Sequence, residues 1–322
     1  MVTIPLVALL IGCATLGLAV LSPVGGNPPL YLVALLSEAT PGRTPSVEPT
    51  LADTKPPATP ESPVTAGSET PVETATPADT PTPLPTPDGV MREVHVPILM
   101  YHYVSVAPTP EDVYRVDLST TPDMFYRQMR WLKENGYNVI SLEHLMYYLD
   151  TGWPELPPRP IVLTFDDGYV DNYTNALPVL QKFGFTGTFF VLTDVTDRRE
   201  PGYMTWEMLR EMRAAGMDIQ VHGREHQQMT GRDRDWLIFH LLGPAQTINA
   251  NLGYQPRFLA YPSGHYDDEV IDVAREMGYW AAVTTTQGSL QSKAAPFEMR
   301  RLRVRGDWDL AAFAGIVQEY SQ

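Results

Sequence analysis

Short hydrophobic runs alternate with longer amphipathic stretches from Glu93 to the C-terminus. The runs are rich in β-branched and aromatic residues, whereas the stretches between them repeat their hydrophobic positions with helical spacing. This alternation predicts an α/β protein with a parallel sheet. The expected strands are Val96–Met100, Asn138–Ser141, Ile161–Phe165, Thr188–Leu192, Asp218–Val221, Phe258–Tyr261, Ala281–Thr285 and Arg301–Val304. The expected helices are Pro122–Glu134, Leu142–Leu149, Tyr173–Phe183, Thr205–Ala215, Asp233–Asn251, Asp267–Met277 and Leu310–Glu319.

Glycine follows most of the expected helices, at the position where a helix commonly ends in the left-handed conformation. These glycines are Gly136, Gly184, Gly216, Gly253 and Gly278. We therefore expect each of them to have a positive φ.

The first 90 residues have a different pattern. Ile4 to Leu21 is an apolar run of about 18 residues, long enough for a membrane span and also acceptable as the apolar part of an export signal. Within it, Leu10–Cys13 resembles a bacterial lipoprotein processing site, which would make Cys13 an acylated anchor, although no Lys or Arg precedes the run. A lipid anchor, an uncleaved span and a cleaved signal all place most of the protein outside the cytoplasm.

Pro, Thr, Ser, Ala and acidic residues dominate from about Pro41 to Pro87. Such a segment buries too little apolar surface to offset its ordering entropy, so we expect it to be disordered and to act as a stalk. A tail without function is the alternative. The expected organisation is a signal peptide or membrane anchor at 1–22, a disordered linker at 23–90 and one catalytic domain at 91–322.

Composition narrows the classes of partner. The net charge of -15 and the pI near 4.8 argue against nucleic acid, which normally requires clustered Lys and Arg. The single cysteine, Cys13, excludes an intrachain disulfide and a cysteine-based metal cluster. The sequence indicates no protein partner, so a membrane contact through the N-terminal segment is the one macromolecular association that we expect beside the substrate.

Polar residues suited to catalysis follow several expected strands. They are His102, Asp166, Asp167, Asp194, His222, Ser263 and Gly264. In parallel α/β barrels the active site lies at the C-terminal ends of the strands, where the loops converge. We therefore expect one site, assembled from several strands.

Asp166 and Asp167 form a carboxylate pair at the end of the run Ile161–Tyr169. Neighbouring side chains in a strand point to opposite faces, so the two acids can share a site only if the backbone bends, which Gly168 allows. Two free carboxylates at close range would share a proton, and a metal ion on one of them removes that conflict. A simple Asp-Asp-Gly turn is the alternative.

His222 and His226 stand four positions apart after another expected strand. One carboxylate and two imidazoles form a three-ligand site of the zinc type, with room for water. We therefore expect Asp167, His222 and His226 to bind a divalent metal, with zinc as the expected ion. Asp166 is left as the catalytic base. Ordinary core or loop histidines are the alternative.

His102 ends the first expected strand of the folded domain. A histidine with a near-neutral pKa suits protonation of a departing amine, so His102 is the candidate acid, and a structural histidine is the alternative. Tyr261–Gly264 is a turn after a strand, and the Ser263 N–H is expected to stabilise an oxyanion. We expect Tyr261, Gly264 and Tyr169 to contact the substrate.

With these residues assembled, the chain resembles the polysaccharide deacetylases of carbohydrate esterase family 4, the nodulation-protein-B-like domain, over roughly Val94 to Phe313. Thr164–Gly168 resembles the first motif of the family, His222–His226 the second and Ala260–Gly264 the third. The resemblance implies a distorted (β/α) barrel with fewer than eight units, a zinc or similar divalent ion, and hydrolysis of N-acetyl groups on a glycan. It assigns the base and the three metal ligands to the same residues as above.

The chain departs from the usual family pattern at two places. Ala260 stands where the third motif usually has Arg, and the usual Leu-x-His segment near the C-terminus is missing. Met100–His102 instead resembles the branch that includes poly-N-acetylglucosamine deacetylases, which implies that His102 is the acid. In that branch an arginine-bearing strand resembles Met299–Val304, which implies that Arg301 orients Asp166, with Arg303 as the alternative.

The function expected from the sequence is therefore metal-dependent N-deacetylation of an N-acetylglucosamine polymer by an exported, surface-tethered enzyme. O-deacetylation of an acetylated polysaccharide and hydrolysis of a small cyclic amide are alternatives within enzymes. A carbohydrate-binding protein on an inactive enzyme fold is the alternative outside them.

Overall fold

The computed structural model describes residues 86–322. The expected anchor at 1–22 and most of the expected linker at 23–90 lie outside these residues. Within the described part, no helix is both long enough and apolar enough to cross a membrane.

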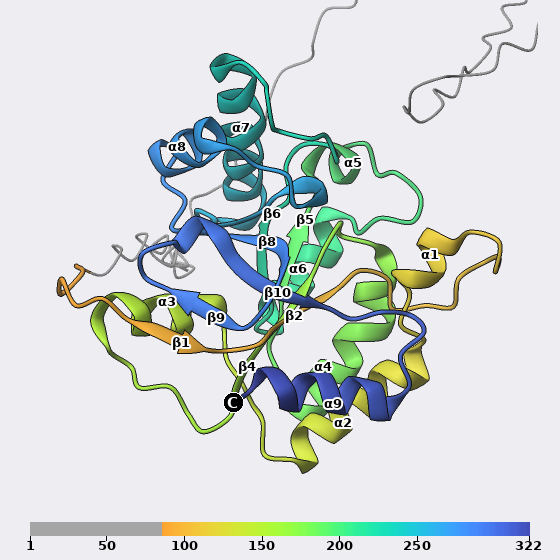
Figure 1. Cartoon of the computed structure of the whole chain (residues 1–322). Coiled ribbons are helices and arrows are strands. Elements are labelled where there is room, and N and C mark those ends of the chain that lie inside the picture. The colour runs from red at the N-terminus through yellow and green to blue at the C-terminus, as the bar shows by residue number, and fades with distance from the viewer. Residues whose placement is uncertain (1–85) are drawn as a thin grey trace, which may run out of the picture. The chain divides into compact units, whose positions relative to one another are not determined.

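Seven parallel strands form a closed barrel, with helices around it (Figure 1). In order around the ring they are β2 (Ile98–Tyr101), β10 (Met299–Arg303), β8 (Ala281–Gln287), β7 (Phe258–Ala260), β6 (Asp218–Val221), β5 (Thr188–Val191) and β4 (Pro160–Phe165). The ring closes because β4 pairs with β2 from Ile98↔Val162 to Tyr101↔Phe165. An eighth strand, β3 (Asn138–Val139), pairs with the first two residues of β4. The expected distorted barrel with fewer than eight units is confirmed.

The longer helices lie close to their expected positions. They are α2 (Pro122–Glu134), α3 (Leu142–Thr151), α4 (Leu177–Phe183), α6 (Trp206–Ala214), α7 (Arg234–Leu252), α8 (Asp268–Glu276) and α9 (Leu310–Tyr320). All but α4 begin after a Ser, Thr or Asp whose side chain accepts a backbone N–H of the first turn. The five glycines expected to follow helices all have positive φ, so that prediction is confirmed.

The sequence pattern missed several short elements. The expected helix Tyr173–Phe183 begins instead as a π-helical turn, η1 (Asn172–Ala176), that continues into α4. The structure also contains α1 (Val113–Asp117), α5 (Thr193–Asp197) and the 3₁₀ turns η2 (Pro262–Gly264) and η3 (Pro296–Glu298). Strands β1 (Glu93–His95) and β9 (Leu290–Ser292) form a separate antiparallel pair. Elements this short show no measurable hydrophobic period.

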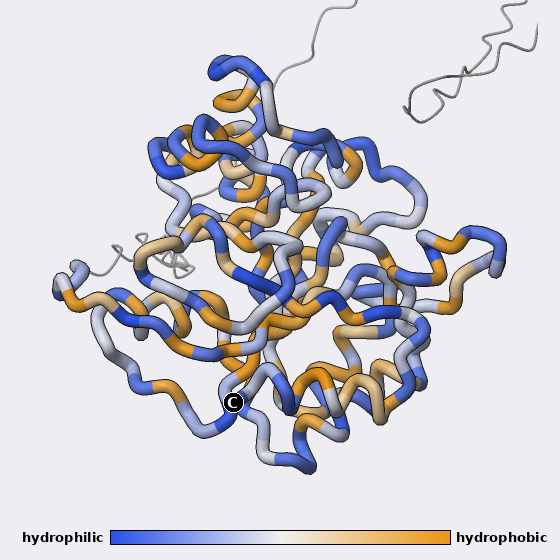
Figure 2. Tube along the Cα trace, viewed as in Figure 1, coloured by the Kyte–Doolittle hydropathy of each residue, from blue (hydrophilic) through white to orange (hydrophobic). Residues whose placement is uncertain are grey.

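Side chains alternate between the two faces of each barrel strand. Leu99, Leu163 and Val191 belong to a hydrophobic cluster that includes residues of the surrounding helices, whereas Ile98 and Val162 belong to a second cluster inside the barrel. Figure 2 shows the corresponding concentration of hydrophobic residues along the central strands. The alternation therefore determines which residues of each strand face the barrel interior.

Helix α3 closes the end of the barrel at which the strands begin. Its Leu145, Met146 and Leu149 are buried in the interior cluster. The Trp280 indole N–H, just before β8, donates to Asp150 of α3 at 2.8 Å. This end of the barrel is filled, so the interior opens at the C-terminal ends of the strands.

Candidate active site

A cavity of about 420 Å³ lies where the barrel strands end. Eight of the ten predicted site residues line it: His102, Asp166, Asp167, Tyr169, His222, His226, Tyr261 and Ser263. A larger surface cavity of about 520 Å³ runs along α7 and contains none of them. The cavity at the strand ends is therefore the candidate site.

The strand period places the deepest side chains of this site. Asp166 directly follows β4 and shares the interior face with Val162 and Thr164, and His222 directly follows β6. Both residues are 2% exposed. Parallel strands that end at one rim thus bring a carboxylate and an imidazole from distant parts of the sequence into one cavity.

The backbone bends at Asp167 so that both acids can share the cavity. Asp167 has φ 73° and Gly168 has φ 78°, so the left-handed conformation begins one residue earlier than the glycine alone suggests. A Cβ on Gly168 would also lie 3.2 Å from Val191 Cγ1. The bend turns Asp167, which an extended strand would point outward, back toward the site.

Asp167, His222 and His226 form a compact set of donors. One ligand atom from each lies within 4.8 Å of the other two, with Asp167 Oδ1 at 3.3 Å from His222 Nε2 and 3.7 Å from His226 Nε2. Asp167 Oδ1 is buried, yet it accepts no hydrogen bond from any residue of 86–322. A buried carboxylate oxygen without a donor, facing two imidazole nitrogens, fits a zinc-type ion.

Hydrogen bonding fixes the tautomer of His222. Its Nδ1 lies 2.7 Å from the Ala260 carbonyl oxygen. Since a carbonyl only accepts, Nδ1 carries the proton and donates it, which leaves the Nε2 lone pair pointing at Asp167 and His226. The main-chain oxygen of Ala260 thereby orients His222, one of the three candidate metal ligands.

The electrostatics of the triad also favour a cation. Burial alone would lower the pKa of His222, but the close contact with Asp167 and the negative charges of Asp166 and Asp167 outweigh it and raise that pKa. Burial would raise the pKa of Asp167, but His222 and the other histidines hold it well below its usual range. The negative field that favours a proton on His222 would equally favour a metal ion in its place.

Arg301 holds Asp166 in a bidentate pair. Arg301 is 1% exposed, and its two terminal nitrogens donate to Asp166 Oδ1 and Oδ2, each at 2.8 Å. Its Nε donates to the Thr284 carbonyl oxygen at 2.8 Å. Burial would raise the pKa of Asp166, but the charge and hydrogen bonds of Arg301 outweigh it, so the pKa lies below its usual value. Arg303 makes no such contact with Asp166.

His102 directly follows β2 and lies beside the carboxylate pair. Its Nε2 is 4.0 Å from Asp166 Oδ2, and its Nδ1 is buried without a hydrogen-bond partner among residues 86–322. The Asn172 side chain donates to the His102 carbonyl oxygen at 2.8 Å, which ties this loop to η1. Burial lowers the pKa of His102, although the two nearby carboxylates oppose that effect.

The third-motif turn brings the backbone of Ser263 to the cavity. Ser263 has φ 58°, a conformation that costs energy for a residue with a Cβ. Gly264 does not line the cavity, and a Cβ there would lie 2.0 Å from Thr285 Oγ1. Tyr261 lines the cavity, but its hydroxyl donates to the Phe297 carbonyl oxygen at 3.1 Å.

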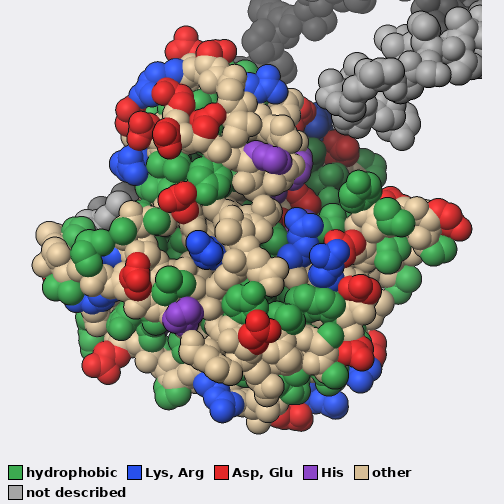
Figure 3. Space-filling model, in the orientation of Figure 1, with side chains coloured by type: hydrophobic (Ala, Val, Ile, Leu, Met, Phe, Trp, Pro, Cys, Tyr) green, Lys and Arg blue, Asp and Glu red, His purple; other side chains and the backbone are tan. Residues whose placement is uncertain are grey.

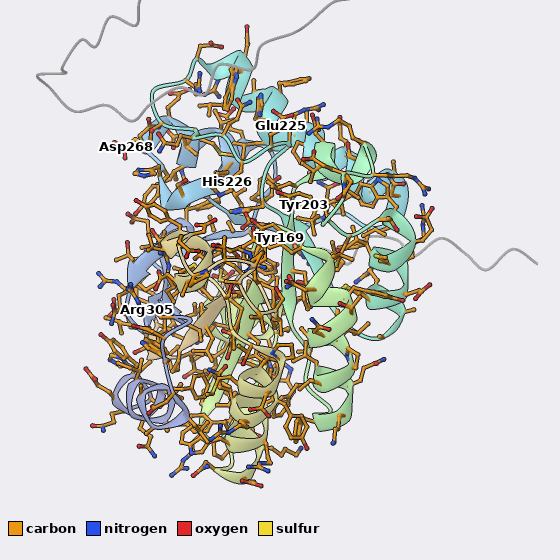
Figure 4. All side chains as sticks on the ribbon, turned by 90° about the vertical axis from the view of Figure 1, so that its right-hand side faces the viewer. Tyr169, Tyr203, Glu225, His226, Asp268 and Arg305 are labelled. Atoms are coloured by element: carbon orange, nitrogen blue, oxygen red, sulfur yellow. The ribbon has the colours of Figure 1, made fainter. Side chains whose placement is uncertain are left out.

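Tyr169, which was predicted to contact the substrate, and Tyr203, which the sequence did not single out, form one wall of the cavity. Tyr169 stacks on Tyr103 with ring centroids 3.6 Å apart and contacts Tyr203 at 5.2 Å. The Arg115 guanidinium lies 3.2 Å from the centroid of Tyr103. Figure 4 shows Tyr169, Tyr203 and His226 close together on this face. Tyr203 comes from a loop whose sequence has no motif or hydrophobic period to indicate its position. Tyr103 directly follows His102, so its place near the site could have been predicted from the sequence.

One polar residue expected at this rim lies elsewhere. Asp194 is in α5 and pairs with Arg224 at 3.2 Å, outside the cavity. Further residues that sequence reasoning missed also line the cavity: Tyr114, Asp117, Leu118, Leu192 and Thr285. Arg303, the alternative to Arg301, lines it as well.

A sequence profile of the polysaccharide deacetylase family matches residues 154–282. These residues include the carboxylate pair, the two histidines and the third-motif turn. Residues 154–282 therefore belong to a polysaccharide deacetylase domain. The domain is accordingly a hydrolase, since a deacetylase removes acetyl groups by hydrolysis.

Individual relatives of this polysaccharide deacetylase domain are moderately similar. YxkH of Bacillus subtilis, a candidate polysaccharide deacetylase, is 27% identical over 223 residues, which are 69% of this chain and 76% of that protein. The poly-β-1,6-N-acetyl-D-glucosamine N-deacetylase of Staphylococcus epidermidis is 26% identical over 214 residues, covering 63% of this chain and 72% of the relative.

Among solved structures, the deacetylase PplD of Streptococcus pyogenes, in complex with acetate, superposes with a TM-score of 0.65 at 29% identity. It covers 70% of this chain and 99% of PplD. IcaB of Ammonifex degensii superposes with a TM-score of 0.61 at 22% identity over 71% of this chain and 97% of IcaB, which is a likeness of fold.

Proposed function

We propose that the protein is a metal-dependent N-deacetylase that acts on a polymer of N-acetylglucosamine. The observation that carries this proposal is the single cavity that combines three metal-type donors, a spare carboxylate held by Arg301, and a buried histidine. The Staphylococcus epidermidis relative, named for poly-β-1,6-N-acetyl-D-glucosamine, supports the choice of glycan and bond.

Asp167, His222 and His226 would hold the metal, for which zinc is the natural candidate given two nitrogen donors and one oxygen donor. When bound, such an ion polarises a carbonyl oxygen and lowers the pKa of water. The 42% exposure of the His226 side chain, against 2% for His222, leaves this side of the triad open to the cavity.

The remaining residues transfer protons during the reaction and stabilise the negative charge that develops on the acetamide oxygen. Asp166, kept ionised by Arg301, accepts the proton of the attacking water. The Ser263 N–H stabilises negative charge on the acetamide oxygen. His102, 4.0 Å from Asp166, donates a proton to the departing nitrogen, so acid and base flank the same space.

The site of action that we propose is outside the cytoplasm. The apolar run Ile4–Leu21 supports export or anchoring, and the Pro-rich segment after it supports a tether to the membrane or cell surface. The partners in this proposal are a glycan substrate and, through the N-terminal segment, a membrane.

The test is acetate release from poly-N-acetylglucosamine, chitin oligomers and peptidoglycan, with and without a chelator. We expect release from at least one of these glycans, its loss with chelator and its return with zinc. Release from acetylated xylan alone would instead identify an O-deacetylase.

Two variants separate the base from the metal site. Asp166→Asn should retain metal while turnover falls by at least about a hundredfold, because the base is lost. His222→Ala should lose both metal and turnover. Metal content measured on the purified variants distinguishes the two roles, and wild-type turnover in either variant contradicts the assignment.

A further inference from the structure

The segment that carries His102 leaves the barrel at the end of β2. The chain then runs past the exposed Val106 into α1, which projects from the edge of the barrel (Figure 1). Helix α1 buries none of its residues, and Figure 3 shows hydrophobic and acidic side chains at the surface there. A helix without a buried residue contributes little to fixing His102, so the inner end of the segment needs another anchor.

The imidazole of His102 is not oriented by a partner at its inner nitrogen. Nδ1 is buried, yet it makes no hydrogen bond with any residue of 86–322. A histidine that works in catalysis commonly has one ring nitrogen bonded to a carboxylate or a carbonyl oxygen, which sets the direction of the other nitrogen. Because the described residues provide no such partner, the position of the ring depends on the backbone that carries it.

Three polar side chains of one turn hold that backbone. The Asn172 side chain donates to the His102 carbonyl oxygen at 2.8 Å. Asp171 Oδ1 accepts from the Val104 N–H at 3.2 Å, and the Asn175 side chain donates to the Val104 carbonyl oxygen at 2.8 Å. Asn172 and Val104 are both fully buried. The backbone on the far side of His102 from β2 is therefore fixed by this turn.

The turn is π-helical where the sequence predicted an α-helix. It is η1, and it continues directly into α4. Single π-helical turns inside α-helices are rare and occur frequently at functional sites. Asp166 and Asp167 precede η1 on the same short stretch of chain, so one segment supplies the base, a metal-type donor and the contacts that hold the acid. The separation of His102 Nε2 and Asp166 Oδ2, 4.0 Å, is set by this segment.

We propose that Asp171, Asn172 and Asn175 position His102 for proton transfer, and that this is what allows the site to cleave amides as well as activated esters. The inference rests on the proposed function and deepens it. Asp171, Asn172 and Asn175 are positioning residues, since none of them lines the cavity.

The leaving group decides how much the position of His102 matters. Water adds to the acetamide carbon, the C–N bond breaks, and the nitrogen takes the proton of His102, which yields acetate and a free amine. A 4-nitrophenolate leaves as a stable anion and needs no such proton. A displaced His102 therefore slows the hydrolysis of an amide more than the hydrolysis of a 4-nitrophenyl ester.

The experiment measures kcat for acetate release from an N-acetylglucosamine oligomer and from 4-nitrophenyl acetate, with the zinc-loaded full-length protein. Asn172→Ala and Asp171→Ala should each lower the ratio of the amide rate to the ester rate at least about tenfold. KM for the oligomer should change less than about twofold, because the positioning residues do not contact the substrate. Asp171→Asn keeps an oxygen that can accept from Val104, so it should restore most of the ratio.

A His102→Ala background tests whether the effect passes through the acid. If Asn172 acts through His102, Asn172→Ala should lower the amide rate no further once residue 102 is alanine. An equal fall in both backgrounds would show that Asn172 acts in another way, and the inference would be wrong.

Asn175→Ala, at a half-buried position, makes the same test with less risk to folding, and Asn135→Ala is its matched control. Asn135 is also half-buried, and its side chain donates to a backbone carbonyl oxygen, that of Trp131, at 2.8 Å. It lies at the end of α2 and does not line the cavity. Asn175→Ala should lower the amide-to-ester ratio, and Asn135→Ala should keep it.

The outcomes separate this inference from the proposed function. If the oligomer releases acetate but the variants of the positioning residues keep the wild-type ratio, or lose amide and ester activity equally, the inference is wrong and the proposed function stands. If no glycan releases acetate, the proposed function fails and the inference fails with it.

Discussion

Two residues of the candidate site hold a backbone conformation that L-amino acids rarely adopt. Asp167 and Ser263 have φ 73° and 58°, and both line the cavity. Such residues persist where the surrounding structure fixes them, and each costs on the order of 1–3 kcal/mol. At Asp167 the conformation turns the carboxylate toward the cavity. The energetic cost therefore serves to position a metal-type donor and does not stabilise the fold.

The Arg301–Asp166 pair gives a test at the same scale. Arg301→Gln removes the bidentate contact, so Asp166 should lose its orientation and kcat should fall by about a hundredfold. The variant should also be less stable by about 3–5 kcal/mol, because a buried carboxylate is left unpaired. Steady-state kinetics and denaturant unfolding measure the two effects. Arg300→Gln, on the same strand but exposed, is the control, and an equal loss there would contradict the assignment.

Gly264 provides a second residue-level test. Gly264→Ala places a Cβ 2.0 Å from Thr285 Oγ1 at a φ of 73°, so the turn that carries Ser263 must shift. We expect kcat to fall at least about tenfold even where the protein remains folded. Thr285→Gly in the same chain removes the clashing side chain and should restore part of the activity. Failure of the double variant to improve on Gly264→Ala would show that φ, rather than the contact, sets the requirement.

At the scale of elements, the hydrophobic strands were the features from which the sequence predicted the site. β4 and β6 were predicted with their polar ends, because a buried strand that stops at Asp or His is visible as a pattern. The sequence could not decide whether Arg301 or Arg303 contacts Asp166. The period of two puts both side chains on one face of the strand and does not say how deep in the barrel each one lies. Depth depends on the register of β10 with its neighbours, Leu302↔Leu99 and Met299↔Val283, which is a long-range property.

Asp218, the first residue of β6, should make the stability of the fold depend on pH. Burial raises the pKa of Asp218 to about 6, although a hydrogen bond from Gln220 opposes it. The unfolded value is 3.8, so between these two pH values the folded state binds more protons than the unfolded state. Stability attributable to this group is therefore present below about pH 4 and is lost as pH rises through 6.

Asp218→Asn should remove that loss. At pH 7 the variant should be more stable than wild type by about 1–3 kcal/mol, and at pH 4 the difference should be near zero. Urea unfolding at both pH values makes the comparison. The prediction is wrong if the variant shows the same stability difference at both.

At the scale of the whole molecule, a metal that binds only the folded state should stabilise it. At a zinc concentration of about 100 times Kd the expected gain is about 2.7 kcal/mol. For a domain of this size the gain corresponds to a rise in Tm of roughly 5–10 °C. Thermal unfolding with zinc and with chelator measures the shift. Asp166→Asn should keep it and His222→Ala should lose it, and an equal shift in all three proteins would place the ion elsewhere.

The barrel class was predictable from the alternation of runs, but its closure was not. Seven strands close because β2 pairs with β4, which skips β3 in the order of the chain. The walls contributed by α1 and by the loop of Tyr203 were also missed, because they come from short or irregular segments whose position depends on contacts with distant residues. The residues nearest the chemistry were therefore easier to predict than those that shape access to it.

The filled floor of the barrel makes the site a cul-de-sac. Because α3 fills one end of the barrel, released acetate has to leave through the open end, which the glycan occupies. Acetate can then leave only after the deacetylated glycan moves away from the opening. Turnover on long glycans should therefore depend on how fast the glycan moves along the rim of the barrel.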